Sequence, residues 1–120
     1  MHLDFSSGIP IYLQLAQSVE DNILRGVFQE ETQIPSTTEV ALHYKINPAT
    51  VGKGYNLLVD DGIIYKRRGV GMFVCKGARN KLMEKRKESF YQKYIISLVE
   101  EAKKLGIGID EIIQMLERSK

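Results

Sequence analysis

The sequence predicts a mostly α-helical fold that contains one small β-hairpin. Two helix start signals, Ser36 and Asn47, lie close together in the 120-residue chain. Two β-rich runs flank a glycine-containing turn over residues 63–74. Residues 80–105 contain neither proline nor glycine, which indicates one long helix near the C-terminus.

The composition excludes several classes of protein. The chain is 43% hydrophobic with a net charge of +2, which fits one domain or one small domain plus an appendage. The single cysteine, Cys75, excludes an intrachain disulfide and favours a reducing cytoplasm. No segment resembles a signal peptide or reaches the ~20 apolar residues of a membrane span. His2 and His43 lack acidic or cysteine neighbours at ligand spacing, and Cys75 lacks an activating histidine. We therefore expect no metal, no cofactor and no catalytic site.

The first helix is predicted to begin at Pro10 and to end near Gly26, since glycine suits the position just past a helix C-terminus. Apolar residues recur at helical spacing between these ends. We expect them to form a buried stripe of Tyr12, Leu15, Ala16, Val19 and Ile23. Val27 and Phe28 are expected to pack where the chain turns.

Two further helices are predicted with only a short turn between them. Ser36, followed three residues later by Glu39, forms a capping box that starts one helix. Lys45 lies in the turn, and Asn47 can cap the next helix, with Pro48 at its first position. Two helices so closely connected are typical of a helix-turn-helix.

The helix that begins after Asn47 has two different faces. Val51, Tyr55 and Leu58 recur at spacings of four and three, so they share a face that can pack. The opposite face carries small, hydroxyl, ammonium and amide groups, on Ala49, Thr50, Lys53 and Asn56. Such a face suits a helix laid into the major groove of DNA. The alternative is an ordinary amphipathic helix with a solvated face.

The β-rich runs predict a hairpin directly after the helix-turn-helix, and such a hairpin is a wing. Arg67 and Arg68 lie at its tip, and Gly69 supports the tight turn. The glycines here do not form a dinucleotide-binding motif, because the third glycine and a following helix are missing. Cys75, just after the second run, is either a redox sensor or a strand-end residue without a role of its own.

The charge distribution is more informative than the net charge. The acidic residues of the first 76 positions lie outside two windows, residues 41–58 and 63–80. The basic residues in those windows are Lys45, Lys53, Lys66, Arg67, Arg68, Lys76 and Arg79. A local basic surface on a nearly neutral domain is what contact with phosphate requires.

We predict two domains, residues 1–76 as the winged helix-turn-helix and residues 77–120 as a helical tail. The long tail helix carries a heptad-like seam, and the last helix, capped by Asp110, carries a second apolar face. These residues are Tyr91, Ile95, Leu98, Ala102 and Leu105, then Ile112, Ile113 and Leu116. A second copy of the chain is the simplest cover for both faces, which predicts a homodimer. The alternative is that both faces pack back onto the first domain.

The ordered set of these motifs resembles the GntR family of bacterial transcription regulators. The set comprises residues 10–15, 34–36 and 47–51, then Tyr55, Leu58, Gly62 and residues 69–74. The short tail resembles the YtrA-like subgroup, which lacks the larger effector-binding domains of other branches and dimerises through the tail. The resemblance implies a winged helix-turn-helix that binds double-stranded DNA. The YtrA-like subgroup also suggests that the regulated genes lie near genes for membrane transporters. A small-molecule effector is possible, but the sequence does not place its site.

The resemblance also selects candidate DNA-facing residues, which are Ser36, Thr38, Asn47, Ala49, Thr50, Lys53, Arg68 and Gly69. Lys45, Lys66 and Arg67 join Lys53 and Arg68 as contacts to phosphate or to the minor groove. Asn47 could bond adenine or simply cap its helix, and capping is favoured. Family members often carry arginine where this chain has Thr38, Asn47-Pro48 and Gly52.

The function that these features predict is that of a cytoplasmic, sequence-specific DNA-binding regulator. It would act as a repressor and bind a palindromic operator as a dimer. The missing arginines keep open a non-specific architectural DNA-binding protein, because arginine makes the commonest specific base contact. A winged-helix protein-interaction module is the third alternative, weakly favoured by the slight excess of acidic residues in the first 76 positions. An enzyme is not expected.

Overall fold

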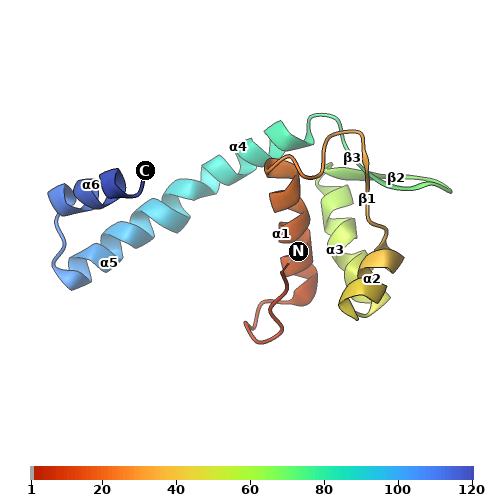
Figure 1. The fold of residues 1–120 in the computed structure, drawn as a ribbon, viewed down its shortest axis with the longest axis horizontal. Helices are drawn as coiled ribbons and strands as arrows, with labels where there is room; N and C mark the ends of the chain where they lie inside the picture. The colour runs from red at the N-terminus through yellow and green to blue at the C-terminus, as the bar shows by residue number, and fades with distance from the viewer. Residues whose placement is uncertain (1) are drawn as a thin grey trace. The chain divides into compact units, whose positions relative to one another are not determined.

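The computed structural model describes residues 2–120, which are mostly helical with one small antiparallel sheet (Figure 1). The helices are α1 Ile11–Leu24, α2 Thr37–Tyr44, α3 Pro48–Asp60, α4 Ala78–Phe90, a π-helical segment η1 Tyr91–Ile96, α5 Ser97–Leu105 and α6 Ile109–Arg118. The strands are β1 Gln33–Ile34, β2 Ile64–Arg67 and β3 Gly71–Val74. The chain divides into two compact units, one that ends at Met83 and one that runs Glu84–Lys120. The predicted fold class is confirmed.

Both helix starts in the middle of the chain are confirmed. The Ser36 hydroxyl accepts a hydrogen bond from the Glu39 backbone N–H at 3.0 Å, and the Glu39 carboxylate accepts one from the Ser36 N–H at 3.2 Å. The Asn47 side-chain oxygen accepts from the Ala49 N–H at 2.8 Å and caps α3. Between the helices, Lys45 has a φ of 54°, the left-handed conformation that turns the chain sharply.

The core of the first unit is formed where α1 and α3 pack together. The predicted stripes meet there, with Leu15, Val19 and Ile23 of α1 and Val51, Tyr55 and Leu58 of α3 all buried. Tyr12 is only half-buried, so it is not part of the buried stripe that was expected.

The expectation for Val27 was wrong, since it is 61% exposed, while Phe28 packs against the core. The N–H groups of both residues donate to the Asn22 carbonyl, and this tight turn leaves Val27 on the outside.

The predicted hairpin is confirmed, and a third strand joins it. The strand order is β1-β3-β2, with Tyr65 opposite Phe73 and Arg67 opposite Gly71. The sequence did not predict β1, because two residues are too few to show an alternating pattern. Its pairing with β3 is decided by tertiary packing, and its Ile34 is buried in the core.

The first turns of α4 complete the first unit. Ala78 and Leu82 are buried in the same core as α1 and α3. The Glu30 carboxylate accepts hydrogen bonds from the Gly77 and Arg79 backbone N–H groups at 2.8 and 3.2 Å. These bonds cap the start of α4 and hold the pKa of Glu30 below its ordinary value.

The second unit consists of two helical segments joined at Gly106, which has a φ of 70°. Asp110 was expected to cap α6, but it does not. Gly108 takes the cap position, and its carbonyl accepts from the Ile112 N–H at 3.0 Å. Asp110 lies in the first turn, where a negative charge still favours the helix dipole.

The wider π-helical segment η1 was not predicted either. It contains Tyr91 and Ile95, so the α-helical spacing assumed for the seam does not hold across it.

Gly54 and Gly52 make a matched test of how closely α3 packs on α1. A Cβ at Gly54 would lie 2.8 Å from the Tyr12 carbonyl oxygen and 3.1 Å from Leu15 Cδ2, whereas a Cβ at Gly52 would meet no atom within 4 Å. We expect Gly54→Ala to lower the free energy of unfolding by about 1–3 kcal/mol through overpacking. Gly52→Ala should raise it by up to ~1 kcal/mol, because alanine favours the helix. Urea unfolding of both variants measures this, and equal effects would contradict the close packing.

Candidate nucleic-acid interface

The start of α2, the length of α3 and the β2–β3 hairpin form the candidate interface, all within the first unit (Figure 1). One hydrogen bond ties α3 to the start of α2. The Tyr55 hydroxyl of α3 donates to the carbonyl of Pro35, just before the α2 cap, at 2.6 Å. Burial raises the pKa of Tyr55 well above its ordinary value, so the phenol keeps the proton that it donates.

The outer face of α3 carries the residue types expected from the sequence. Ala49, Lys53 and Asn56 are exposed and Thr50 is half-buried. Asn47 uses its side-chain oxygen for the cap, so it cannot at the same time make a bidentate bond to adenine, which needs both the oxygen and the amide. The preference for capping is therefore confirmed.

Lys53 has a partner that the sequence did not reveal. Its ammonium lies 4.1 Å from the centroid of the Tyr12 ring, which is a cation–π contact from α3 to α1. Tyr12 had been predicted only as a core residue. The contact restricts a flexible side chain, and Lys53 remains exposed.

The wing tip places two neighbouring arginines in different surroundings. The Val70 N–H donates to the Arg67 carbonyl at 2.9 Å, which closes a turn with Arg68 and Gly69 in its middle. Gly69 has a φ of 76°, a conformation that favours glycine. The Arg67 guanidinium lies 4.8 Å from the centroid of the Phe73 ring, on the face of the sheet. Arg68 is exposed at the corner of the turn, where it can reach farther from the protein.

The remaining candidates lie at the ends of α2 and along β2. Thr38 is exposed in the first turn of α2, and Ser36 is half-buried at its cap. Lys45 is exposed at the C-terminus of α2, and Lys66 is exposed on β2 opposite Met72. Exposed helix N-termini and basic side chains on one unit can hold phosphate groups.

Gln33 is a residue of this region that the sequence analysis missed. Its side-chain amide donates to the Val70 carbonyl at the wing tip, at 3.0 Å. No sequence signal could have found it, because the contact depends on the pairing of β1 with β3.

Other chemistry-bearing groups offer little. Within residues 2–120, no three His, Cys, Asp or Glu side chains gather to hold a metal ion, and no helix is long and apolar enough to cross a membrane. Burial raises the pKa of the half-buried Cys75 thiol, which disfavours the reactive thiolate.

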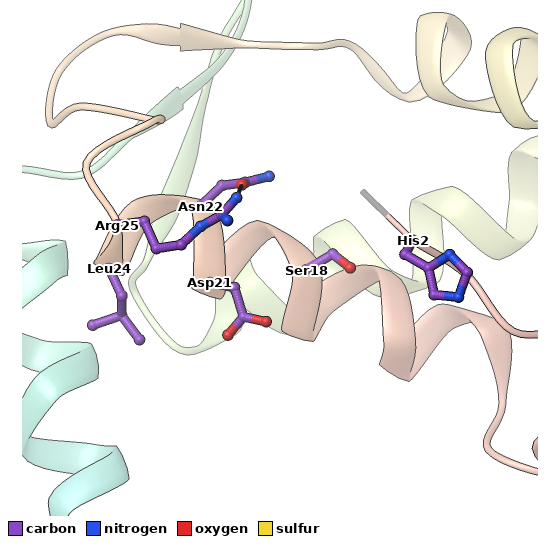
Figure 2. A pocket seen from close by; sticks show the side chains of 6 residues that line it. All are labelled: His2, Ser18, Asp21, Asn22, Leu24 and Arg25. Carbon is purple, nitrogen blue, oxygen red and sulfur yellow. Dashed lines mark hydrogen bonds between the residues drawn. The ribbon is translucent and has the colours of Figure 1, made fainter. Parts of the chain in front are cut away.

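A hollow of about 420 Å³ lies along α1 and the N-terminal arm (Figure 2). It is lined by His2, Ser18, Asp21, Asn22, Leu24 and Arg25. Arg25 donates to the Asn22 side-chain oxygen at 2.7 Å, so two polar groups that line the hollow already bond to each other. None of the lining residues belongs to α2, α3 or the wing.

Comparison with known proteins gives consistent matches. The family model of the bacterial regulatory proteins of the gntR family matches residues 11–74, which is more than half of the chain. The HTH-type transcriptional repressor YtrA of Bacillus subtilis is 28% identical over 117 residues, which cover 98% of this chain and 89% of YtrA.

Two solved structures extend the comparison. A GntR-family protein from Bacteroides thetaiotaomicron is 38% identical, with a TM-score of 0.69, over 92% of this chain and 99% of that one. The DNA-binding domain of AraR, solved in complex with the operator ORX1, is 26% identical with a TM-score of 0.56. That match covers 62% of this chain and 99% of the AraR domain.

Proposed function

This chain belongs to the GntR family of bacterial regulatory proteins, and we propose that it is a sequence-specific repressor that binds a palindromic operator as a homodimer. The family consists of DNA-binding transcription regulators, so the chain binds DNA and is not an enzyme. The similarity to YtrA over nearly the full length of both chains confirms the resemblance to the YtrA-like subgroup. The name of that relative supports a repressor. DNA binding supports an action in the cytoplasm.

The observation that carries the proposal is that three DNA-facing segments are joined in the free protein. The Tyr55–Pro35 bond links α3 to the start of α2, and the Gln33–Val70 bond links β1 to the wing tip. A helix and a wing held in fixed places can enter adjacent grooves without first being ordered, which saves entropy on binding. The AraR domain, solved on its operator, is a relative of this fold engaged with DNA.

We assign the contacts by chemistry and position. Ala49 and Thr50 face the major groove, where their methyl groups can touch a thymine methyl. Arg68 and Gly69 at the wing tip enter the minor groove, and Arg67 contacts its edge. The residues left to hold the backbone are Ser36, Thr38, Lys45, Asn47, Lys53 and Lys66.

The proposal of a homodimer rests on how few side chains are buried in the second unit. Among Glu84–Lys120, only Ala102 is buried. Large apolar side chains remain exposed on its helices, among them Tyr91, Ile95, Leu98, Leu105, Ile113 and Leu116. Ile112 is half-buried. A unit of this size with one buried side chain is not stable by itself, and a second copy supplies a matching apolar surface by symmetry.

A second candidate is a non-specific architectural DNA-binding protein. It is favoured by Thr38, Pro48 and Gly52, which stand where arginine often contacts DNA in the family. Affinity that does not depend on a palindrome would support this alternative.

The first test compares DNA sequences. A duplex selected from a random library should contain an inverted repeat with half-sites about one helical turn apart. The dimer should bind it at least 10³-fold more tightly than a shuffled duplex at physiological salt. Lys53→Ala should weaken binding to both duplexes and lower the slope of log affinity against log salt by about one unit per bound copy.

Thr50→Ala is the matched control on the same helix face. It should reduce discrimination between the two duplexes and leave the salt slope unchanged. Equal losses of affinity on both duplexes for both variants would contradict the assignment of Thr50 and favour the architectural alternative.

A second test addresses the dimer. Leu98→Glu places a charge on the proposed interface, where its desolvation is unfavourable, so we expect a monomer by light scattering at micromolar concentration. Gln114→Glu adds the same charge at an exposed polar position of α6 and should remain dimeric. A Leu98→Glu protein that stays dimeric would overturn the proposed interface.

A further inference from the structure

The short strand β1 stands between the wing and the helix-turn-helix. It pairs with β3 through Gln33 opposite Phe73 and Ile34 opposite Met72. The next residue along the chain is Pro35, whose carbonyl is held by Tyr55, and then Ser36, the cap of α2. The strand therefore connects the wing directly to the start of α2.

The backbone ladder of β1 ends before it reaches the wing tip. Extending the antiparallel register by two residues would place Ser36 opposite Val70 as the next hydrogen-bonded pair, but the Ser36 N–H donates to the Glu39 carboxylate in the α2 cap instead. The last backbone pairing is thus at Met72, and the turn that presents Arg68 and Gly69 lies beyond it.

The side chain of Gln33 continues the connection where the backbone stops. Gly71 is the diagonal neighbour of Gln33 on the same face of the sheet, two residues along β3 from Phe73. A Cβ at Gly71 would lie 2.5 Å from Gln33 Nε2, so only glycine lets the amide cross this point. Beyond Gly71 the amide donates to the Val70 carbonyl at 3.0 Å.

As a result, both the N–H and the carbonyl of Val70 are hydrogen-bonded. Its N–H donates to Arg67 within the hairpin, and its carbonyl accepts from Gln33 outside the hairpin. The first bond fixes the shape of the turn. The second fixes where the turn lies relative to the start of α2.

We infer that Gln33 is a positioning residue of the DNA interface, which holds the wing tip so that Arg68 and Gly69 meet the minor groove at a set distance from α2. This inference rests on the proposed function. Gln33 itself need not touch DNA, and its effect is transmitted through Arg68. Without the amide, the tip must be ordered as DNA binds, and that ordering lowers affinity.

A double-mutant cycle tests the inference with the full-length dimer and the selected duplex. Gln33→Ala should lower affinity about three- to tenfold, the range expected from one hydrogen bond. It should lower the thermal midpoint by at most a few degrees, because the bond is exposed. Arg68→Ala should lower affinity in the wild-type background and have a much smaller effect in the Gln33→Ala background. Gln17→Ala, at an exposed position of α1, is the control that should change neither measurement.

The outcomes distinguish a failure of the positioning role of Gln33 from a failure of the proposed function. Additive losses in the cycle, or unchanged affinity of Gln33→Ala, would overturn the positioning role while leaving sequence-specific binding intact. Failure of the wild-type dimer to prefer any selected duplex would instead overturn the proposed function, and the inference with it. A merely structural role for Gln33 would lower the thermal midpoint without the non-additive effect on Arg68.

Discussion

The hydrogen bond from the Tyr55 hydroxyl to the Pro35 carbonyl is the constraint on which the candidate DNA-binding surface depends. It joins the middle of α3 to the junction between β1 and α2. Tyr55 is 1% exposed, so its hydroxyl has little access to water if the bond is lost. The cap of α2 follows Pro35 directly and the wing-holding Gln33 precedes it by two residues. One interaction therefore fixes the start of α2 relative to α3, and Gln33 extends the link to the wing tip.

The local elements of this fold could be predicted because their signals are local. The capping box at Ser36, the Asn47 cap and the glycine-containing wing turn each depend on residues within a few positions of one another. The apolar face of α3 followed from its spacing. Gly54 lies on that face as well, and its close approach to the Tyr12 carbonyl lets α3 pack tightly on α1.

What the sequence did not reveal depends on contacts between distant residues. Strand β1 exists because β3 pairs with it, and Gln33 reaches Val70, 37 positions later, only in that arrangement. The Tyr12 ring under Lys53 likewise joins two helices. In the tail, the π-helical segment changed the spacing on which the seam was based, and Gly108 took the cap expected of Asp110. The eleven candidate DNA-binding residues all lie in the first unit, but their individual roles remain a prediction.

The most direct measurement of the central claim is the effect of Tyr55→Phe, which removes one hydroxyl and keeps the ring. We expect the free energy of unfolding to fall by about 1–2 kcal/mol, because the Pro35 carbonyl loses its buried partner. We also expect weaker binding to the selected duplex with an unchanged far-UV circular dichroism spectrum. Tyr44→Phe, at a half-buried tyrosine outside this link, should leave DNA affinity unchanged. A Tyr55→Phe protein with wild-type stability and wild-type DNA affinity would contradict the account.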